Sequence, residues 1–209
     1  MIADLELTSG LPPGLTAATG MDAHAHSFEA YYAPGYHPMA DGIALEGMRL
    51  INEKLIVAFG DGEGTTAQTH LLMAASMGAT AFQKGFGLIH ALSHPLADVT
   101  GLHHGTANAI FQPYVMVHNR SEIEARMPRL ARTLELTGER FEDVLNWTLA
   151  LRDRLHLPHM LEGILDESLI ERLVSMAAAD PSLTTNPKPC SADDLERVYR
   201  KALRGDLDP

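Results

Sequence analysis

The 209-residue sequence contains one cysteine, Cys190, and few basic residues. A single thiol can form neither an internal disulfide nor a multi-thiolate zinc site, so we expect a reducing compartment, the cytoplasm. The chain has only 16 lysines and arginines, which are scattered along it, and 27 aspartates and glutamates. Because phosphate backbones are bound by concentrated basic patches, we expect no nucleic-acid partner.

Long apolar runs are also missing. No stretch approaches the roughly 20 apolar residues of a membrane-spanning helix. The opening MIADLELTSGLPPG lacks the basic and apolar regions of a secretory signal. We therefore expect no membrane partner. An apolar content of 45% is still sufficient for one domain with a substantial core.

Strand patterns are nearly absent, whereas apolar residues recur with a helical period along most of the chain. The sequence therefore predicts an all-α fold, a helical bundle. Residues 1–19, rich in Gly, Pro and Thr, are expected to form an extended lead-in, and residues 20–209 the helical domain. The expected helices cover residues 20–31, 38–58, 65–92, 105–118, 120–136, 139–155, 167–179 and 191–204.

Glycine and proline are expected to separate these helices. Pro95 is expected to interrupt the chain after the helix at 65–92. The segment GDGEG at 60–64 follows no predicted strand and lacks the lysine of a phosphate-binding loop. We therefore interpret it as a connector and not as a nucleotide site.

Four histidines lie in one otherwise apolar segment, GFGLIHALSHPLADVTGLHHGTANAI, at residues 85–110. His90 and His94 are one helical turn apart, a spacing that places two side chains on one helix face. His104 follows ten residues later. Histidine is a common metal ligand but also occurs in cores as a hydrogen-bonded neutral residue, so the group alone leaves both interpretations open.

A second pair lies upstream in TGMDAHAHSFEAYY, where Asp22 and His26 are also one turn apart. Asp22 alone could instead serve the first turn of its helix. Combined, the two groups offer one carboxylate oxygen and three imidazole nitrogens, a set that suits Fe²⁺ or Zn²⁺ and can leave a position open for substrate. These candidate metal ligands are Asp22, His26, His90 and His104.

Other polar residues have weaker patterns. Glu29 and Glu46 could accept a hydrogen bond from a ligand imidazole, although solvated helix positions explain them equally well. His24 would point about 200° around the helix from Asp22. The histidines without comparable pairing are assigned to helix surfaces or turns: His24, His37, His70, His118, His156 and His159.

Two long motifs, TGMDAHAHSFEAYYAPGYHPMADGIALEGMRLI and GLIHALSHPLADVTGLHHGTANAIFQPYVMVHN, resemble the iron-containing (group III) alcohol dehydrogenase family. The likeness continues through LRDRLHLPHML to TTNPKPCSADDLERVYRKAL. In that family an Asp and a His one turn apart, and the first and last histidines of an H-x3-H-x9-H-G pattern, hold the metal. The resemblance thus implies the same ligands, Asp22, His26, His90 and His104. It makes the middle histidine, His94, a candidate catalytic residue that relays a proton.

The resemblance further implies the C-terminal, metal-binding domain of an oxidoreductase that interconverts alcohols and aldehydes. Fe²⁺ is the implied metal, with Zn²⁺ possible. Family members begin with an α/β nucleotide-binding domain that has no counterpart in this sequence. The chain is therefore expected to be a truncated or separate half that is inactive alone. NAD or NADP would bind only with a separate nucleotide-binding half, and a homo-oligomer is a further expected assembly.

Two other functions fit the same residues. Metal-dependent phosphohydrolases also use helical His and Asp sites, but they need a basic residue near the metal to hold phosphate, and only Lys84 and Arg49 are candidates. A metal-binding or interaction module without turnover is the other alternative. An exposed apolar patch that seeks a partner would favour it.

Overall fold

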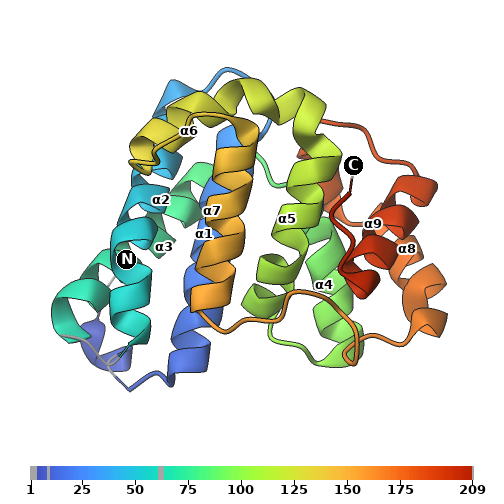
Figure 1. Cartoon of the computed structure of the whole chain (residues 1–209), viewed down its shortest axis with the longest axis horizontal. Coiled ribbons are helices and arrows are strands. Elements are labelled where there is room, and N and C mark those ends of the chain that lie inside the picture. Colours follow the sequence, from blue (N-terminus) through green and yellow to red (C-terminus); the bar gives the residue numbers. More distant parts are fainter. Residues whose placement is uncertain (1–3, 9, 61–63, 209) are drawn as a thin grey trace.

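The computed structural model describes residues 4–8, 10–60 and 64–208, and within these ranges it contains helices and no strand. The predicted all-α fold is confirmed (Figure 1). Short 3-10 helices occur at η1 (Leu5–Leu7), η2 (Phe82–Lys84), η3 (Glu124–Arg126), η4 (Glu167–Leu169) and η5 (Pro181–Thr185). The α-helices are α1 (Pro13–Tyr32), α2 (Pro38–Phe59), α3 (Gly64–Ala81), α4 (Leu88–Thr100), α5 (His104–Ile123), α6 (Met127–Thr133), α7 (Phe141–Arg154), α8 (Ile170–Ala178) and α9 (Ala192–Arg204).

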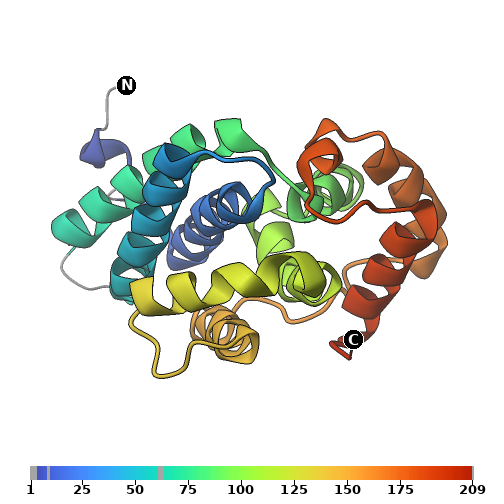
Figure 2. The ribbon, with the colours of Figure 1, turned by 90° about the horizontal axis from the view of Figure 1, so that it is seen from above.

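Helix α1 is the central helix of the bundle. It packs against α2, α3 and α5, which enclose it in the view of Figure 2. Of its 20 residues, 14 are buried, so apolar and small side chains surround it on every side. A helix of this kind is a core element, not an amphipathic surface helix. Candidate functional side chains on α1 are therefore fully buried, as Glu29 is, or partly buried, as Asp22 and His26 are.

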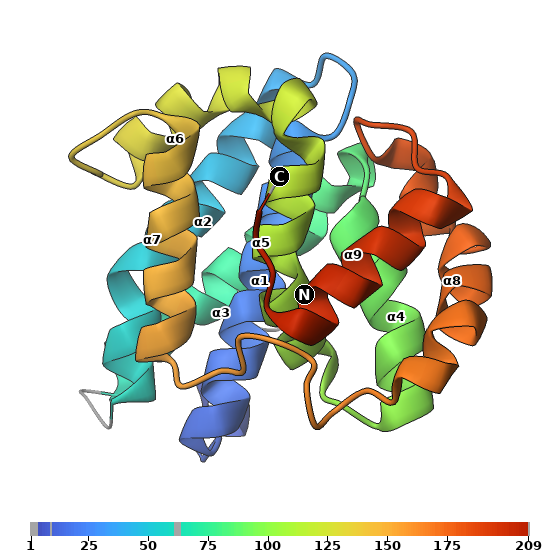
Figure 3. The same cartoon turned by 45° about the vertical axis from the view of Figure 1, so that its right-hand side comes forward.

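Helix α4 lies next to α5 and carries His90 and His94. Helices α8 and α9 pack against α4 and α5 at the end of the molecule remote from α2 and α3 (Figures 1 and 3). Large apolar side chains of α4, including Leu88, Ile89 and Leu92, are fully buried. Buried on both sides, α4 holds its histidines in fixed positions near α1 and α5.

Several helix boundaries differ from those predicted. Helix α1 begins at Pro13, within the expected lead-in, because proline suits the first turn of a helix. The expected helix at 65–92 is divided by η2 and by Gly85, whose φ of 154° is open to glycine and rarely to other residues. The predicted interruption at Pro95 is wrong, since Pro95 lies inside α4. Helix α5 also continues past the expected end at residue 118.

The expected connector at 60–64 falls largely outside the described residues. Gly60 ends α2, and its backbone N–H donates to the carbonyl of Ile56. Residues 61–63 are not described. Among the described helices, none combines the length and apolar content needed to cross a membrane.

The first turn of α5 approaches α1 very closely at Gly105. A Cβ atom at this position would lie 2.0 Å from the carbonyl oxygen of Ala18 and 3.1 Å from the Cβ atom of Asp22. Only glycine permits this approach, because a carbon and an oxygen cannot come so near without moving the backbone. The contact brings His104, the preceding residue, beside Asp22.

We predict that Gly105→Ala lowers the free energy of unfolding by about 1–3 kcal/mol, because the added methyl group must push α5 away from α1. Urea denaturation measures this difference. Gly42→Ala is the matched control: Gly42 lies inside α2 with nothing within 4 Å of its Cβ position. That change should stabilise the protein by about 0.5–1 kcal/mol. Equal stability of the two variants would contradict the close packing.

Candidate metal centre

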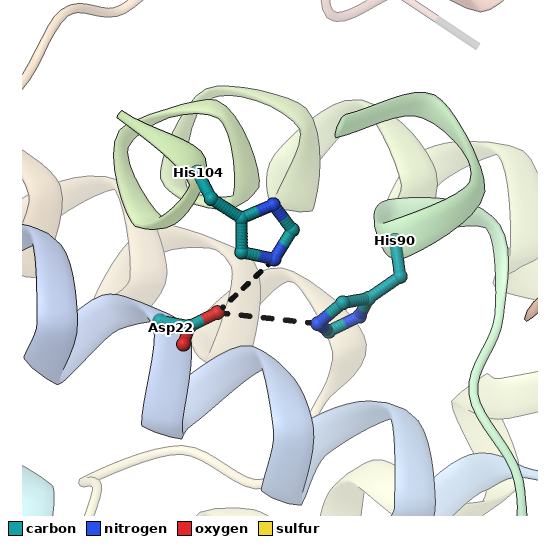
Figure 4. Close-up of side chains that lie close together, drawn as sticks. All are labelled: Asp22, His90 and His104. Atoms are coloured by element: carbon teal, nitrogen blue, oxygen red, sulfur yellow. Dashed lines mark ion pairs between the residues drawn. The ribbon is translucent and has the colours of Figure 1, made fainter. Parts of the chain in front are cut away.

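Three helices bring candidate ligands together. Asp22 lies on α1, His90 on α4 and His104 at the start of α5, and Figure 4 shows their side chains pointing toward one another. Oδ1 of Asp22 is 3.4 Å from Nε2 of His104 and 4.0 Å from Nε2 of His90. The three ligand atoms all lie within 4.8 Å of one another. Two ligand atoms that share one ion at about 2.1 Å lie about 3.4 Å apart in tetrahedral geometry, so the spacing approaches that of a metal site.

The fourth candidate, His26, lies beside the same carboxylate. Its Nε2 is 3.7 Å from Oδ1 of Asp22. Its ring stacks on that of His90, with the ring centres 4.9 Å apart and the planes within 11°. All four residues predicted from the sequence are therefore near one another, although His26 stands outside the tightest group of three.

His94 occupies a different position from these four. Its Nδ1 is 2.8 Å from Oδ2 of Asp180, which precedes η5, and its side chain is 44% exposed. Its ring stacks on His104 at 5.1 Å between centres. His94 is thus next to the cluster, open to solvent and anchored through one nitrogen. The other nitrogen, Nε2, has no hydrogen-bond partner among the described residues.

Glu29 connects α1 to the first turn of α4. Its carboxylate is fully buried and accepts hydrogen bonds from the backbone N–H groups of Gly87 and Ile89 at 3.0 and 2.7 Å. It also accepts one from Nδ1 of His90 at 2.6 Å and one from the hydroxyl of Tyr32 at 3.0 Å. A proton on Nδ1 leaves Nε2 of His90 with its lone pair toward Asp22.

Glu46, in contrast to Glu29, is not buried and does not contact a candidate ligand. Its carboxylate is partly exposed and pairs with Arg49 on the same helix. Of the two glutamates that the sequence singled out, Glu29 contacts a candidate ligand and Glu46 contacts Arg49.

Burial keeps the imidazoles of His26 and His104 in the neutral form that binds a metal. Removal from solvent lowers the pKa of His104 to about 4, an effect that the charge of Asp22 opposes only in part. Burial likewise lowers the pKa of His26, with Asp22 again acting in the opposite direction. Both rings are therefore neutral near pH 7. Neutral nitrogens beside one carboxylate are suitable ligands for Fe²⁺ or Zn²⁺, so the residues present fit a divalent metal.

Aromatic rings cover one side of the cluster. Phe86 stacks on His90 at 4.3 Å between ring centres, and Phe82 stacks on Phe86 at the same separation. Both rings also lie within 5.6 Å of His26. These apolar rings exclude water from that side, which strengthens electrostatic interactions within the site.

The prediction of a surface position for His24 is wrong. His24 is fully buried, with Nδ1 3.1 Å from Oε1 of Gln112 and its ring against Trp147. Burial lowers its pKa to about 4. The error arises because α1 is buried on all sides, so pointing away from one face does not lead to solvent. His37, His156 and His159 are exposed, whereas His70 and His118 are partly buried.

Sequence reasoning missed two residues that contact the candidate site residues, Asn108 at the cluster and Asp180 at His94. Asn108 lies one turn after His104, and this spacing is visible in the motif HGTAN. Asp180 is 86 residues from His94, and no local pattern connects the two. The basic residues expected of a phosphate site are already paired: Lys84 with Asp41 at 2.6 Å, and Arg49 with Glu46.

The fold and the cluster define an all-α domain with an Asp and His site of the kind that holds a divalent metal. More specifically, the chain belongs to the Fe-containing alcohol dehydrogenase family, because the model of that family's C-terminal domain matches residues 16–203.

Named relatives agree with this assignment. The chain is 39% identical over 212 residues to 4-hydroxybutyrate dehydrogenase of Cupriavidus necator, covering 97% of this chain and 55% of that protein. It is 34% identical over 214 residues to NAD-dependent methanol dehydrogenase of Bacillus methanolicus, again covering 97% and 55%. The chain thus spans about half the length of the curated relatives it matches.

Solved structures share the fold. The crystal structure of 1,3-propanediol oxidoreductase is similar with a TM-score of 0.90 and 28% identity, over 96% of this chain and 55% of that one. The iron-containing alcohol dehydrogenase from Thermococcus thioreducens is similar with a TM-score of 0.89 and 28% identity, over 98% and 54%.

We predict that Glu29→Gln lowers the free energy of unfolding by about 2–4 kcal/mol in metal-free protein, because the new NH₂ group faces buried donors that need an acceptor. Urea denaturation in the presence of a chelator measures the loss. Glu46→Gln removes one partner of a partly exposed ion pair and should cost less than about 1 kcal/mol. A loss at Glu29 as small as that at Glu46 would argue against its role in joining α1 to α4.

Proposed function

We propose that this chain is the metal-binding half of an NAD- or NADP-linked dehydrogenase that interconverts small alcohols and aldehydes. The observation that carries the proposal is the approach of Asp22, His90 and His104 from three different helices. Membership of the Fe-containing alcohol dehydrogenase family and the dehydrogenase names of the relatives support it. Fe²⁺ is the metal that the family name favours, and Zn²⁺ suits the same donors.

The proposed ligands are the four residues Asp22, His26, His90 and His104. When bound there, a divalent metal supplies Lewis-acid polarisation of the substrate oxygen. The chain's own contribution is to prepare the ligands: Glu29 holds the proton on Nδ1 of His90, and burial keeps His104 neutral. Nε2 of His90, which faces Asp22, is then free to donate a lone pair, and the neutral ring of His104 has one unprotonated nitrogen that can do the same.

His94 is the proposed proton-relay residue. Asp180 accepts a hydrogen bond from its Nδ1–H, which leaves Nε2 available to accept a proton from a substrate hydroxyl. The half-exposed ring can pass that proton to solvent. In aldehyde reduction the same nitrogen would return a proton to the forming hydroxyl group.

The hydride acceptor is proposed to be NAD or NADP on a separate nucleotide-binding half. The described residues contain no strand, and hence no strand-to-helix glycine turn of the kind that binds a cofactor pyrophosphate. The relatives are nearly twice as long as this chain, which leaves room in them for such a half. The proposed substrate would then lie between the metal site and the nicotinamide.

Phosphate hydrolysis is less well supported than alcohol oxidation. Lys84 is buried and bound to Asp41 and to the carbonyl of Tyr31, and Arg49 pairs with Glu46. Neither cation is free to hold a phosphate beside the cluster. A metal-binding module without turnover would use the same ligands, so measurements of metal binding and of turnover must be made separately.

We predict that His104→Ala weakens Zn²⁺ or Co²⁺ binding at least about tenfold, because it removes a ligand and the stabilisation linked to binding. His94→Ala should leave metal affinity unchanged, since His94 is anchored on Asp180. Chelator competition on the purified variants, followed by elemental analysis, measures both. Equal loss of metal in the two variants would contradict the separate role of His94, and no loss in His104→Ala would contradict the metal site.

We also predict that the 209-residue chain, loaded with metal, binds neither NAD nor NADP measurably and oxidises no alcohol above background. Hydride transfer requires the nicotinamide to be held about 3–3.5 Å from the substrate carbon, and the pyrophosphate site provides most of that positioning. Calorimetry with each cofactor tests the expectation. Micromolar affinity would show that this chain itself contributes a cofactor site.

A further inference from the structure

The side-chain amide of Asn108 contacts three candidate ligands of the metal, Asp22, His90 and His104. Its side chain is fully buried, and Nδ2 lies 2.8 Å from Oδ1 of Asp22, 3.0 Å from Nε2 of His104 and 3.4 Å from Nε2 of His90. Among the described residues, this side chain forms hydrogen bonds to candidate ligands only. One amide nitrogen therefore contacts the same three atoms that would surround a metal.

The other end of the Asn108 amide has no partner. Oδ1 is buried and accepts no hydrogen bond within the described residues. A buried polar atom without a partner costs about 1–3 kcal/mol, and such atoms in native proteins call for a functional explanation. The amide cannot simply be reversed, because Oδ1 would then face the Asp22 carboxylate. The ligand atoms alone thus determine how Asn108 is oriented.

The three contacts differ in their compatibility with a bound metal. In a neutral imidazole the unprotonated nitrogen has one available lone pair, which either accepts a hydrogen bond or binds an ion. A carboxylate oxygen has two lone pairs and can do both. The hydrogen bond to Asp22, which is also the shortest of the three, is therefore the one that can persist when His90 and His104 bind a metal.

We propose that Asn108 is a positioning residue that holds the Asp22 carboxylate in the orientation that binds the metal. This inference rests on the proposed metal site and adds a residue to it that is not a ligand. Before metal binds, the same amide draws Asp22, His90 and His104 to within hydrogen-bond distance of one point. The ligands are thereby assembled in advance, and less ordering is required when the metal enters.

The test is Asn108→Leu, which keeps the shape of the side chain and removes its donor. Zn²⁺ affinity, measured by chelator competition, should fall about 10–100-fold. Asn52→Leu is the matched control. Asn52 donates to the carbonyl of Leu134 and accepts from Trp147, and neither partner belongs to the cluster, so this change should reduce stability but not Zn²⁺ affinity. The absorption bands of bound Co²⁺ should change in the Asn108 variant alone.

A double-mutant cycle with Asp22→Ala shows whether Asn108 acts through Asp22. In that background, Asn108→Leu should change Zn²⁺ affinity less than threefold, because the carboxylate it positions is gone. An equal loss in both backgrounds, or unchanged affinity in the single variant, overturns the proposal while leaving the metal site intact. Failure of the unmodified protein to bind Zn²⁺ would overturn both.

A measurement on the unmodified protein covers the case in which Asn108→Leu fails to fold. In the Zn²⁺-loaded protein, NMR should detect the Asn108 side-chain NH₂ with slowed hydrogen exchange, because one N–H still donates to Asp22. An NH₂ group that exchanges as fast in the Zn²⁺-loaded protein as an exposed asparagine would overturn the proposal.

Discussion

The buried carboxylate of Glu29 is the interaction on which the arrangement of the site depends. It lies on the central helix and meets the first turn of α4, where backbone N–H groups have no partners within their own helix. A negative charge is favourable at a helix N-terminus, so the same group both begins α4 and fixes its position relative to α1. Glu29 also accepts a hydrogen bond from a ring nitrogen of His90. One side chain thus sets the place of a helix and the tautomer of a histidine on it.

The segment around η5 supports α4 from the other side. Oδ1 of Asn186 accepts hydrogen bonds from the backbone N–H of Leu88 and from Asn119, and Thr185 donates to the carbonyl of Phe86. These contacts also place Asp180 within 2.8 Å of His94. The residues that orient the two α4 histidines therefore come from opposite ends of the sequence. Glu29 lies on α1, and Asp180 lies in the segment that precedes η5 and α9.

The sequence predicts the helical class and the pairing of acidic and histidine side chains, because both follow from spacing along one helix, whereas the joining of the two pairs into one site rests on donor chemistry and on the family resemblance. Asp22 and His26, or His90 and His94, are one turn apart wherever their helix lies. Contacts between distant segments leave no such pattern. Asp180 was missed for this reason, and His24 was misplaced because the sequence does not reveal that α1 is enclosed on every side. The predicted interruption at Pro95 was wrong for a related reason. The packing of α4 outweighs the one backbone hydrogen bond that the proline removes.

The close approach of α5 to α1 at Gly105 has a consequence for how the chain unfolds. It places residues 22 and 104, which are distant in sequence, beside one another at the cluster. An ion held by side chains from α1, α4 and α5 would act as a cross-link that closes long loops of the polypeptide. In a protein with a single cysteine, such an ion would do what a disulfide does elsewhere, by restricting the disordered chain, and it would do so reversibly and without oxidation.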